Sequence, residues 1–194
     1  MDRDIIYVNP EWLELNTFEF KTIIMFSYLS SKNIFTGTIK TMCDFFGRSS
    51  TSKTIKKFKS AIETLEQKKY ISVAKDGYLW IITLQPPTSG DIIIYKDDID
   101  AIMQTDLSYG VADEVIIKLF VYLHINQNVR RTHEQMCEEL GCGKSAVKEA
   151  MRVLTSLNFK NFYIDRDRMR SWSKEAGTIY KFKFINDNTQ ILME

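Results

Sequence analysis

Two short segments carry lysine, arginine and hydroxyl side chains at the spacing of one helix face. The first offers Ser52, Lys53, Thr54, Lys56, Lys57 and Ser60, and the second offers Lys144, Ser145, Lys148 and Arg152. Cationic side chains pair with phosphates, and these groups also donate hydrogen bonds to base edges in a DNA groove. We therefore predict that these residues are DNA-binding residues on two helices. A solvated helix face without a ligand is the alternative interpretation.

Each segment lies in a helix-turn-helix pattern, which is clearest from Thr132 to Leu157. Thr132 has the residue type that caps a helix N-terminus. Gly141 suits the sharp turn, because a residue without Cβ adopts a positive φ at little cost. The second helix is then expected to bury Val147 and Leu154 and to expose the basic residues between them.

The same pattern occurs twice in the chain. A shift of 94 positions places Phe26 on Phe120, Thr38 on Thr132, Met42 on Met136, Cys43 on Cys137 and Gly47 on Gly141. After the turn the shift becomes 92 positions and places Ile62 on Leu154. A self-match of this length predicts an internally duplicated unit.

A β-hairpin is predicted after the first helix-turn-helix. Alternating β-branched and aromatic residues flank Asp76 and Gly77, a pair typical of two-residue hairpin turns. A helix-turn-helix followed by such a hairpin is a winged helix, and we predict that Lys75 contacts DNA from the hairpin. Tyr78 and Trp80 are expected to pack against the helices, because a hairpin needs an apolar face to adhere to its domain. Stacking on bases is the alternative for both rings.

A second, longer hairpin is predicted near the end of the chain. Arg166, Arg168 and Arg170 alternate with other residues there, and Trp172 follows. Arginine is favoured in a narrow minor groove, so we include these three arginines among the candidate DNA-binding residues. A solvated hairpin tip is an equally open interpretation.

A proline-paired stretch separates the two copies and predicts the domain organisation. The expected divisions are a first winged-helix domain at 1–84, a short linker at 85–90 and a second winged-helix domain at 91–194. The strand Ile92–Tyr95 is expected to open the second domain. The predicted fold class is α+β, mainly α, with two tandem winged-helix domains related by internal duplication.

Charge distribution is more informative than total charge. The 194 residues include 26 basic and 25 acidic residues, so the bulk charge does not indicate a polyanionic partner. Residues 48–69, however, hold seven bases and two acids, whereas residues 85–118 hold two bases and seven acids. Clustered bases on a predicted second helix favour phosphate contact.

The sequence matches the motifs of phosphate-binding loops and zinc sites poorly. Gly143, Lys144 and Ser145 resemble the end of a phosphate-binding loop, but Glu138 stands where its first glycine is required. His124, His133, Cys137 and Cys142 suggest zinc, yet Cys137 repeats Cys43 in a copy that has no histidine. We therefore predict no enzyme activity, no catalytic residue, no metal site and no cofactor.

Other features concern the cellular environment. The chain has three cysteines, and its first residues lack a basic start followed by a long apolar run. No stretch approaches the roughly 18 apolar residues that a membrane span needs. A cytoplasmic protein without a membrane partner is the expectation.

In organisation, the chain resembles tandem winged-helix replication initiators of plasmids and phages of low-GC Gram-positive bacteria. The resemblance rests on the segment DIIIYKDDIDAIM, the Leu/Tyr-rich helix after it and the pattern TxxxMCxxLG, and it extends over nearly the whole chain at the level of fold. It implies sequence-specific binding to repeated or inverted sites in double-stranded DNA. Replication proteins or a second copy of the chain are the further partners implied.

Two other functions remain open at this point. A transcriptional regulator or a DNA-transfer accessory factor would use the same surface. A winged-helix protein-interaction module without DNA binding, similar to the kleisin-binding subunits of condensation complexes, belongs to another class. The run Lys53–Lys59 favours DNA, because such subunits tend to be acidic and to lack lysine-rich second helices.

Overall fold

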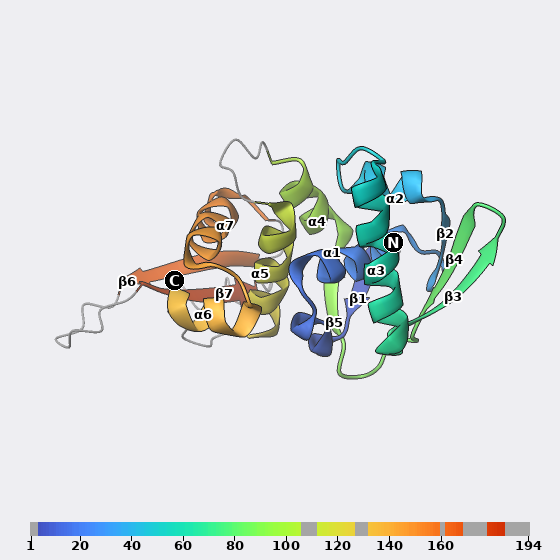
Figure 1. The fold of residues 1–194 in the computed structure, drawn as a ribbon. Helices are drawn as coiled ribbons and strands as arrows, with labels where there is room; N and C mark the ends of the chain where they lie inside the picture. Colours follow the sequence, from blue (N-terminus) through green and yellow to red (C-terminus); the bar gives the residue numbers. More distant parts are fainter. Residues whose placement is uncertain (1–3, 106–111, 127–131, 160–161, 169–177, 185–194) are drawn as a thin grey trace. The chain divides into compact units, whose positions relative to one another are not determined.

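The computed structural model describes residues 4–105, 112–126, 132–159, 162–168 and 178–184, and its fold is α+β and mainly helical (Figure 1). The chain divides by its contacts into two compact units, Met1–Lys96 and Asp97–Glu194. The predicted α+β class with mainly helical content is therefore confirmed.

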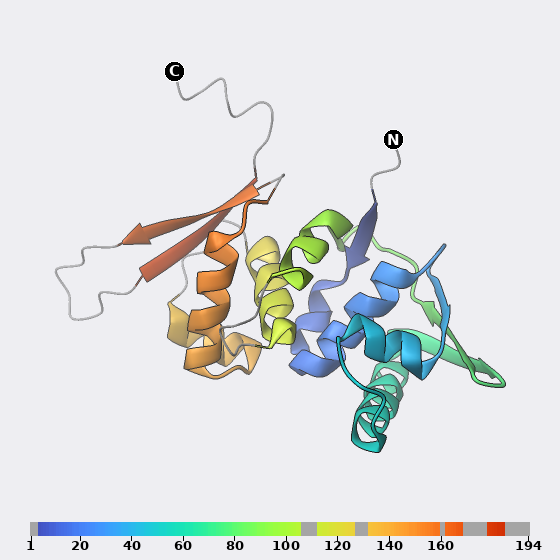
Figure 2. The ribbon, with the colours of Figure 1, turned by 90° about the horizontal axis from the view of Figure 1, so that it is seen from above.

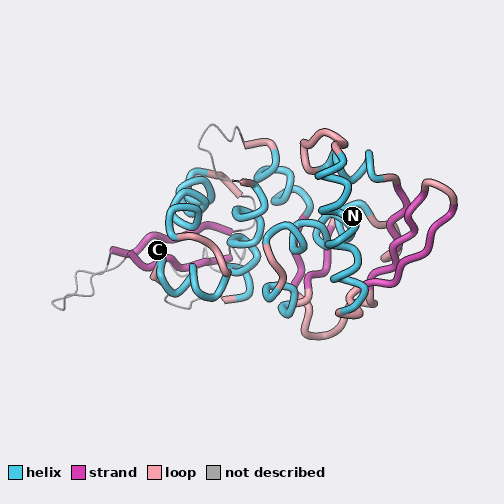
Figure 3. Tube along the Cα trace, viewed as in Figure 1, coloured by secondary structure: helices cyan, strands magenta, loops and turns pink. Residues whose placement is uncertain are grey.

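Unit 1 contains four helical segments and two small antiparallel sheets within its described residues (Figure 3). Its elements are β1 (Ile5–Val8), the 3-10 helix η1 (Pro10–Glu14), α1 (Thr17–Leu29), β2 (Ile34–Gly37), α2 (Ile39–Phe45), α3 (Ser52–Gln67), β3 (Ile71–Asp76), β4 (Leu79–Leu84) and β5 (Ile92–Tyr95). One sheet has the strand order β2-β4-β3, and the other pairs β1 with β5. Strands β3 and β4 form a hairpin whose tip lies away from the helices (Figure 2).

The core of unit 1 forms where α1 and α3 cross. Phe20 and Phe26 of α1 and Phe58 of α3 are fully buried. The ring of Phe46, at the end of α2, lies 4.9 Å from that of Phe58 in an edge-to-face arrangement. Burying a side chain of this size stabilises the fold by about 1.5–3 kcal/mol, so the aromatic contacts fix which face of α3 turns inward.

Strand β5 belongs to unit 1 and not to the second unit, where the sequence placed it. It pairs antiparallel with β1, with Ile6 opposite Ile94 and Val8 opposite Ile92. The segments Asp4–Tyr7 and Asp91–Tyr95 are similar in sequence, and the two strands they contain pair with each other. The contact boundary at Lys96 thus differs from the predicted linker at 85–90, which runs from β4 to β5 within unit 1.

Unit 2 is built around a buried helix with two further helices packed on it. Its elements are α4 (Lys96–Met103), α5 (Asp113–Ile125), α6 (His133–Leu140), α7 (Lys144–Ser156), β6 (Phe162–Arg168) and β7 (Thr178–Phe184), with α4 starting at the boundary itself. Leu119 and Phe120 of α5 and Val147 and Leu154 of α7 are buried, as their helical spacing predicts.

A short turn joins α6 to α7. Gly141 ends α6 with φ of 63°, the left-handed conformation that its residue type predicts. The buried Lys118 of α5 donates a hydrogen bond of 2.8 Å from Nζ to the carbonyl oxygen of Leu140, one of the acceptors that a helix end leaves without an intrahelical partner. The turn that positions α7 is therefore held by α5 as well as by local backbone geometry.

Candidate nucleic-acid interface

Helix α3 presents the predicted basic face to solvent. Thr51 caps the helix, and its hydroxyl oxygen accepts a hydrogen bond of 3.2 Å from the backbone N–H of Thr54. Inward packing of Phe58, Ile62 and Leu65 leaves the opposite face outside. Of the predicted residues, Ser52, Lys53, Lys56, Lys57 and Ser60 are exposed, and Thr54 is half-buried beside its cap.

These five exposed side chains line a single depression on the surface of α3. Two hydroxyl-bearing residues and three lysines therefore share one part of the α3 surface. The sequence predicted this set from helical spacing alone, and the structure brings its members together except for Thr54, which does not line the depression. The depression also lies along the first turns of α3, where the helix dipole adds positive potential.

The charge on this face is not compensated by nearby acids. Within the described residues, Lys53, Lys56 and Lys59 have no ion pair. The Nζ atom of Lys57 lies 5.7 Å from the centroid of the Phe18 ring, a weak cation–π contact that leaves its charge intact. An anion approaching α3 thus meets several ammonium groups that are not already neutralised.

The β3–β4 hairpin holds a second group of candidate residues. Gly77 turns it with φ of 57°, and Lys75 lies directly opposite Trp80 with Nζ 3.9 Å from the centroid of the indole ring. The Lys75 side chain therefore lies across the hairpin against Trp80, and this cation–π contact stabilises the position of the indole ring.

The expected packing of the hairpin aromatics is wrong for Tyr78. Its side chain is 94% exposed, because Gly77 and Tyr78 form the two-residue turn at the hairpin tip, between the paired residues Asp76 of β3 and Leu79 of β4. The turn thus begins one residue later than the expected Asp76-Gly77 pair. Trp80 is half-buried and is covered by Lys75. The exposure of Tyr78 agrees with the alternative in which its ring is open to contact, and its place directly after Asp76-Gly77 was the available indication of exposure.

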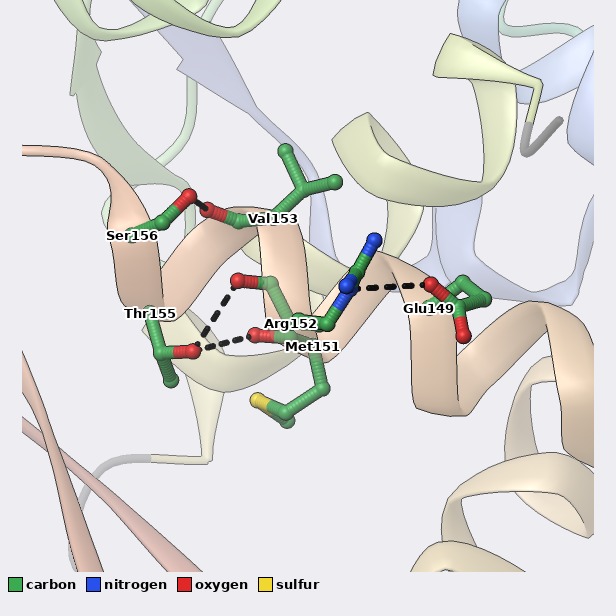
Figure 4. Close-up of polar contacts among 6 residues, drawn as sticks. All are labelled: Glu149, Met151, Arg152, Val153, Thr155 and Ser156. Carbon is green, nitrogen blue, oxygen red and sulfur yellow. Dashed lines mark hydrogen bonds and ion pairs between the residues drawn. The ribbon is translucent and has the colours of Figure 1, made fainter. Parts of the chain in front are cut away.

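Helix α7 also exposes its predicted bases, but two of them are paired. Lys144 forms a hydrogen-bonded ion pair with Glu134 of α6. The hydrogen bond and charge of Glu134 raise the pKa of Lys144, and the same contact lowers the pKa of Glu134. The Nε atom of Arg152 lies 3.1 Å from Oε2 of Glu149 (Figure 4). Lys148 and Ser145 are exposed.

The C-terminal end of α7 uses its hydroxyl groups internally. Thr155 donates from Oγ1 to the carbonyl oxygen of Met151 at 2.9 Å, and Ser156 donates from Oγ to that of Val153 at 2.7 Å (Figure 4). These bonds satisfy the hydroxyls within the helix. The surface of α7 that is open to an anion therefore centres on its N-terminal half.

Part of the second predicted hairpin is described. Arg166 and Arg168 lie on β6, opposite Tyr180 and Thr178 of β7. Their side chains, and the whole of Arg170, lie outside the described residues.

The residues considered for a phosphate-binding loop or a metal site do not lie in the arrangement that either site needs. Gly143 precedes α7 and follows α6, where a phosphate-binding loop would follow a strand. Burial raises the pKa of both Cys137 and Cys142, which disfavours the thiolate that zinc needs. In the described part of the chain, no group of three or more His, Cys, Asp or Glu side chains is placed to hold a metal ion.

Comparison with known proteins gives no family. No protein-family model matches the chain, and a search of curated proteins found no match. Among the described residues, no helix is long and apolar enough to cross a membrane.

Proposed function

We propose that this protein binds double-stranded DNA in a sequence-specific manner and that α3 of unit 1 is its principal reading element. The observation that carries the proposal is the depression lined by Ser52, Lys53, Lys56, Lys57 and Ser60. A protruding helix with lysines and hydroxyls on one face matches the width and the polyanionic edges of a major groove.

The order of elements in unit 1 supports a winged-helix interpretation. Helices α1, α2 and α3 are interrupted by β2 and followed by the hairpin β3–β4, and β2 joins that hairpin to complete a three-stranded sheet. In a winged helix of this kind, α3 enters the major groove and the hairpin lies along the flanking backbone. Lys75 and Tyr78 are placed on that hairpin.

Unit 2 has three helices and a hairpin in a similar order, α5, α6, α7 and β6–β7. This order, together with the sequence self-match, supports two tandem winged-helix domains related by duplication. Linking two weak DNA-binding modules raises the overall affinity through effective concentration, even when one module is much the weaker.

The biological role that we propose is initiation of replication of a plasmid, phage or other mobile element. It rests on the resemblance of the sequence to initiators, and the partners that follow are origin DNA, replication proteins and a second copy of the chain. Regulation of transcription or assistance in DNA transfer would use the same α3 surface. A footprint inside a replication origin, with melting of the adjacent duplex on protein addition, would distinguish initiation from these roles.

The direct test is selection of bound duplexes from a random-sequence pool at two salt concentrations, followed by sequencing. We expect an enriched motif that survives the higher salt, and loss of enrichment for the Lys56→Ala variant. Lys59→Ala is the matched control, because Lys59 is exposed on the same helix and does not line the depression. Binding that disappears with salt and enriches no sequence would favour the protein-interaction module instead.

A further inference from the structure

Unit 1 contains a cavity of about 590 Å³ at the end of α3 remote from the candidate DNA-binding face. Its walls come from β1 and η1, from the turn before β2, from residues 68–70 after α3 and from the segment 84–91. Cavities of roughly 300–1,000 Å³ are the size that proteins use for small-molecule ligands. The proline-rich segment expected to be a linker is thus one wall of a cavity within unit 1.

Basic residues outnumber acidic ones at this cavity, whose lining also includes Glu11 and Asp91. Lys32, Lys68, Lys69 and Lys96 line it, and Lys96 is engaged by Asp4 at 3.1 Å. Within the described residues, the other three lysines are exposed and have no ion pair. Three ammonium groups around one concave site are suited to a phosphate, which accepts hydrogen bonds on several oxygens at once.

Two of these lysines occupy backbone positions that normally favour glycine. Lys32 has φ of 52° and Lys69 has φ of 61°, and both residues line the cavity. Lys32 lies in the tight turn between Ser31 and Ile34, and Lys69 lies just beyond the C-cap of α3, where its backbone N–H donates to the carbonyl oxygen of Glu66. A side chain at such a position costs about 1–2 kcal/mol relative to glycine. Strained non-glycine residues cluster at ligand sites, so their side chains are expected to serve a purpose that glycine cannot.

Aromatic residues also line the cavity. Trp12 and Tyr70 both line it, with ring centroids 6.3 Å apart in an edge-to-face arrangement. Burial, with the charges of Glu11 and Glu14, raises the pKa of Tyr70. Its hydroxyl is a hydrogen-bond donor at neutral pH, as that of any tyrosine is. Glu11 also lines the cavity and provides an acceptor near these rings.

We propose that this cavity binds a nucleotide. The lysines hold the phosphates, the aromatic rings contact the base, and Glu11 accepts a hydrogen bond from an exocyclic amino group. The site is argued from the cavity alone and does not depend on DNA binding by α3.

The test is calorimetric titration of the full chain with ATP, without DNA, alongside adenosine and inorganic triphosphate. We expect saturable binding of one ATP per chain, with adenosine and triphosphate each at least about tenfold weaker because each lacks one half of the recognised chemistry. The variants Lys32→Gly and Lys69→Gly are each expected to weaken ATP binding about fivefold, the loss of one charge-assisted contact. Lys40→Ala is the control, because Lys40 is exposed on α2 and does not line the cavity.

The glycine variants also separate ligand binding from a structural role. Glycine relieves the left-handed strain, so the melting temperature is expected to stay level or rise while ATP affinity falls. Unchanged ATP affinity in both variants would overturn the proposal, as would equal affinity for ATP and triphosphate or no binding at millimolar ATP. If the variants instead weaken only DNA binding, these lysines contact backbone phosphates and the nucleotide site is excluded.

Discussion

Helices α3 and α7 each follow a short helix and a glycine turn, and each exposes basic residues, but the state of those residues differs. On α3, Lys53 and Lys56 have no ion pair within the described residues, and with Lys57 they line one depression. On α7, Lys144 is bound by Glu134 and Arg152 by Glu149. The number of bases on a helix is therefore a poor measure of the charge available to DNA.

The bases of α3 and α7 differ in whether a carboxylate competes with a phosphate for them. A phosphate that approaches Lys144 or Arg152 must displace a carboxylate, whereas one that approaches Lys53 displaces only water and counterions. An exposed ion pair is worth about 0.2–1 kcal/mol, so the pairs on α7 weaken a DNA contact without preventing it. Under the proposed function, α3 is therefore expected to contribute more to DNA affinity than α7.

The largest expected effect compares the two helices directly. Alanine at Lys53, Lys56 and Lys57 together should weaken binding to a selected duplex about 100-fold near 0.1 M salt, because three phosphate or base contacts are lost. Alanine at Lys144, Lys148 and Arg152 together should weaken it less than about tenfold, since two of these groups are already paired. Fluorescence anisotropy across a salt series measures both losses, and circular dichroism verifies the folds. Equal losses would break the comparison.

The next effect concerns the turns that position the two helices. Gly47 and Gly141 have φ of 60° and 63°, and an added Cβ meets no atom within 4 Å at either position. Replacement by alanine should therefore destabilise the protein by about 1–2 kcal/mol through backbone strain alone. Gly143→Ala is the matched control, because Gly143 has φ of −68° and equal space. Urea denaturation measures the differences, and a cost for Gly143→Ala as large as that for Gly141→Ala would contradict the strain argument.

Local chemistry made much of this architecture predictable. Thr132 caps α6, Gly77 turns the hairpin and Gly141 ends α6, each for a reason contained in the residue type. Strand pairing was not predictable in this way, because β1 and β5 have similar sequences and alternation does not reveal a strand's partner.

Some residues of the candidate site were predictable from one helix, and others depend on how the elements pack. Helical spacing selected the residues of the α3 depression, because one helix determines their positions. The pairing of Lys144 with Glu134 depends on how α6 and α7 pack across the turn, and the exposure of Tyr78 depends on how far the hairpin extends. Both require the tertiary structure.

A smaller effect tests whether the ion pairs on α7 restrain binding. Replacing Glu134 and Glu149 with glutamine should strengthen DNA binding about threefold, because each substitution removes a carboxylate that pairs with a base of α7. The control is Glu63→Gln on α3, which adds the same charge change per residue but releases no base, because Glu63 has no ion pair within the described residues. If Glu63→Gln increases the free energy of DNA binding by half as much as the double variant does, the effect is due to net charge and not to the release of a base.

The smallest effect is a titration. The hydrogen bond and ion pair with Lys144 lower the pKa of Glu134. The pair therefore stabilises the fold above the ordinary glutamate pKa, and this stabilisation is lost as the pH falls through the lowered value. Glu134 is solvent-exposed, so the shift is expected to be small and to shrink with added salt. An NMR titration of the Glu134 carboxyl carbon should show its midpoint rising in the Lys144→Ala variant. An unchanged midpoint would mean that the pair does not persist in solution and that Lys144 is as open to phosphate as Lys53, which would remove the distinction between α3 and α7 at this position.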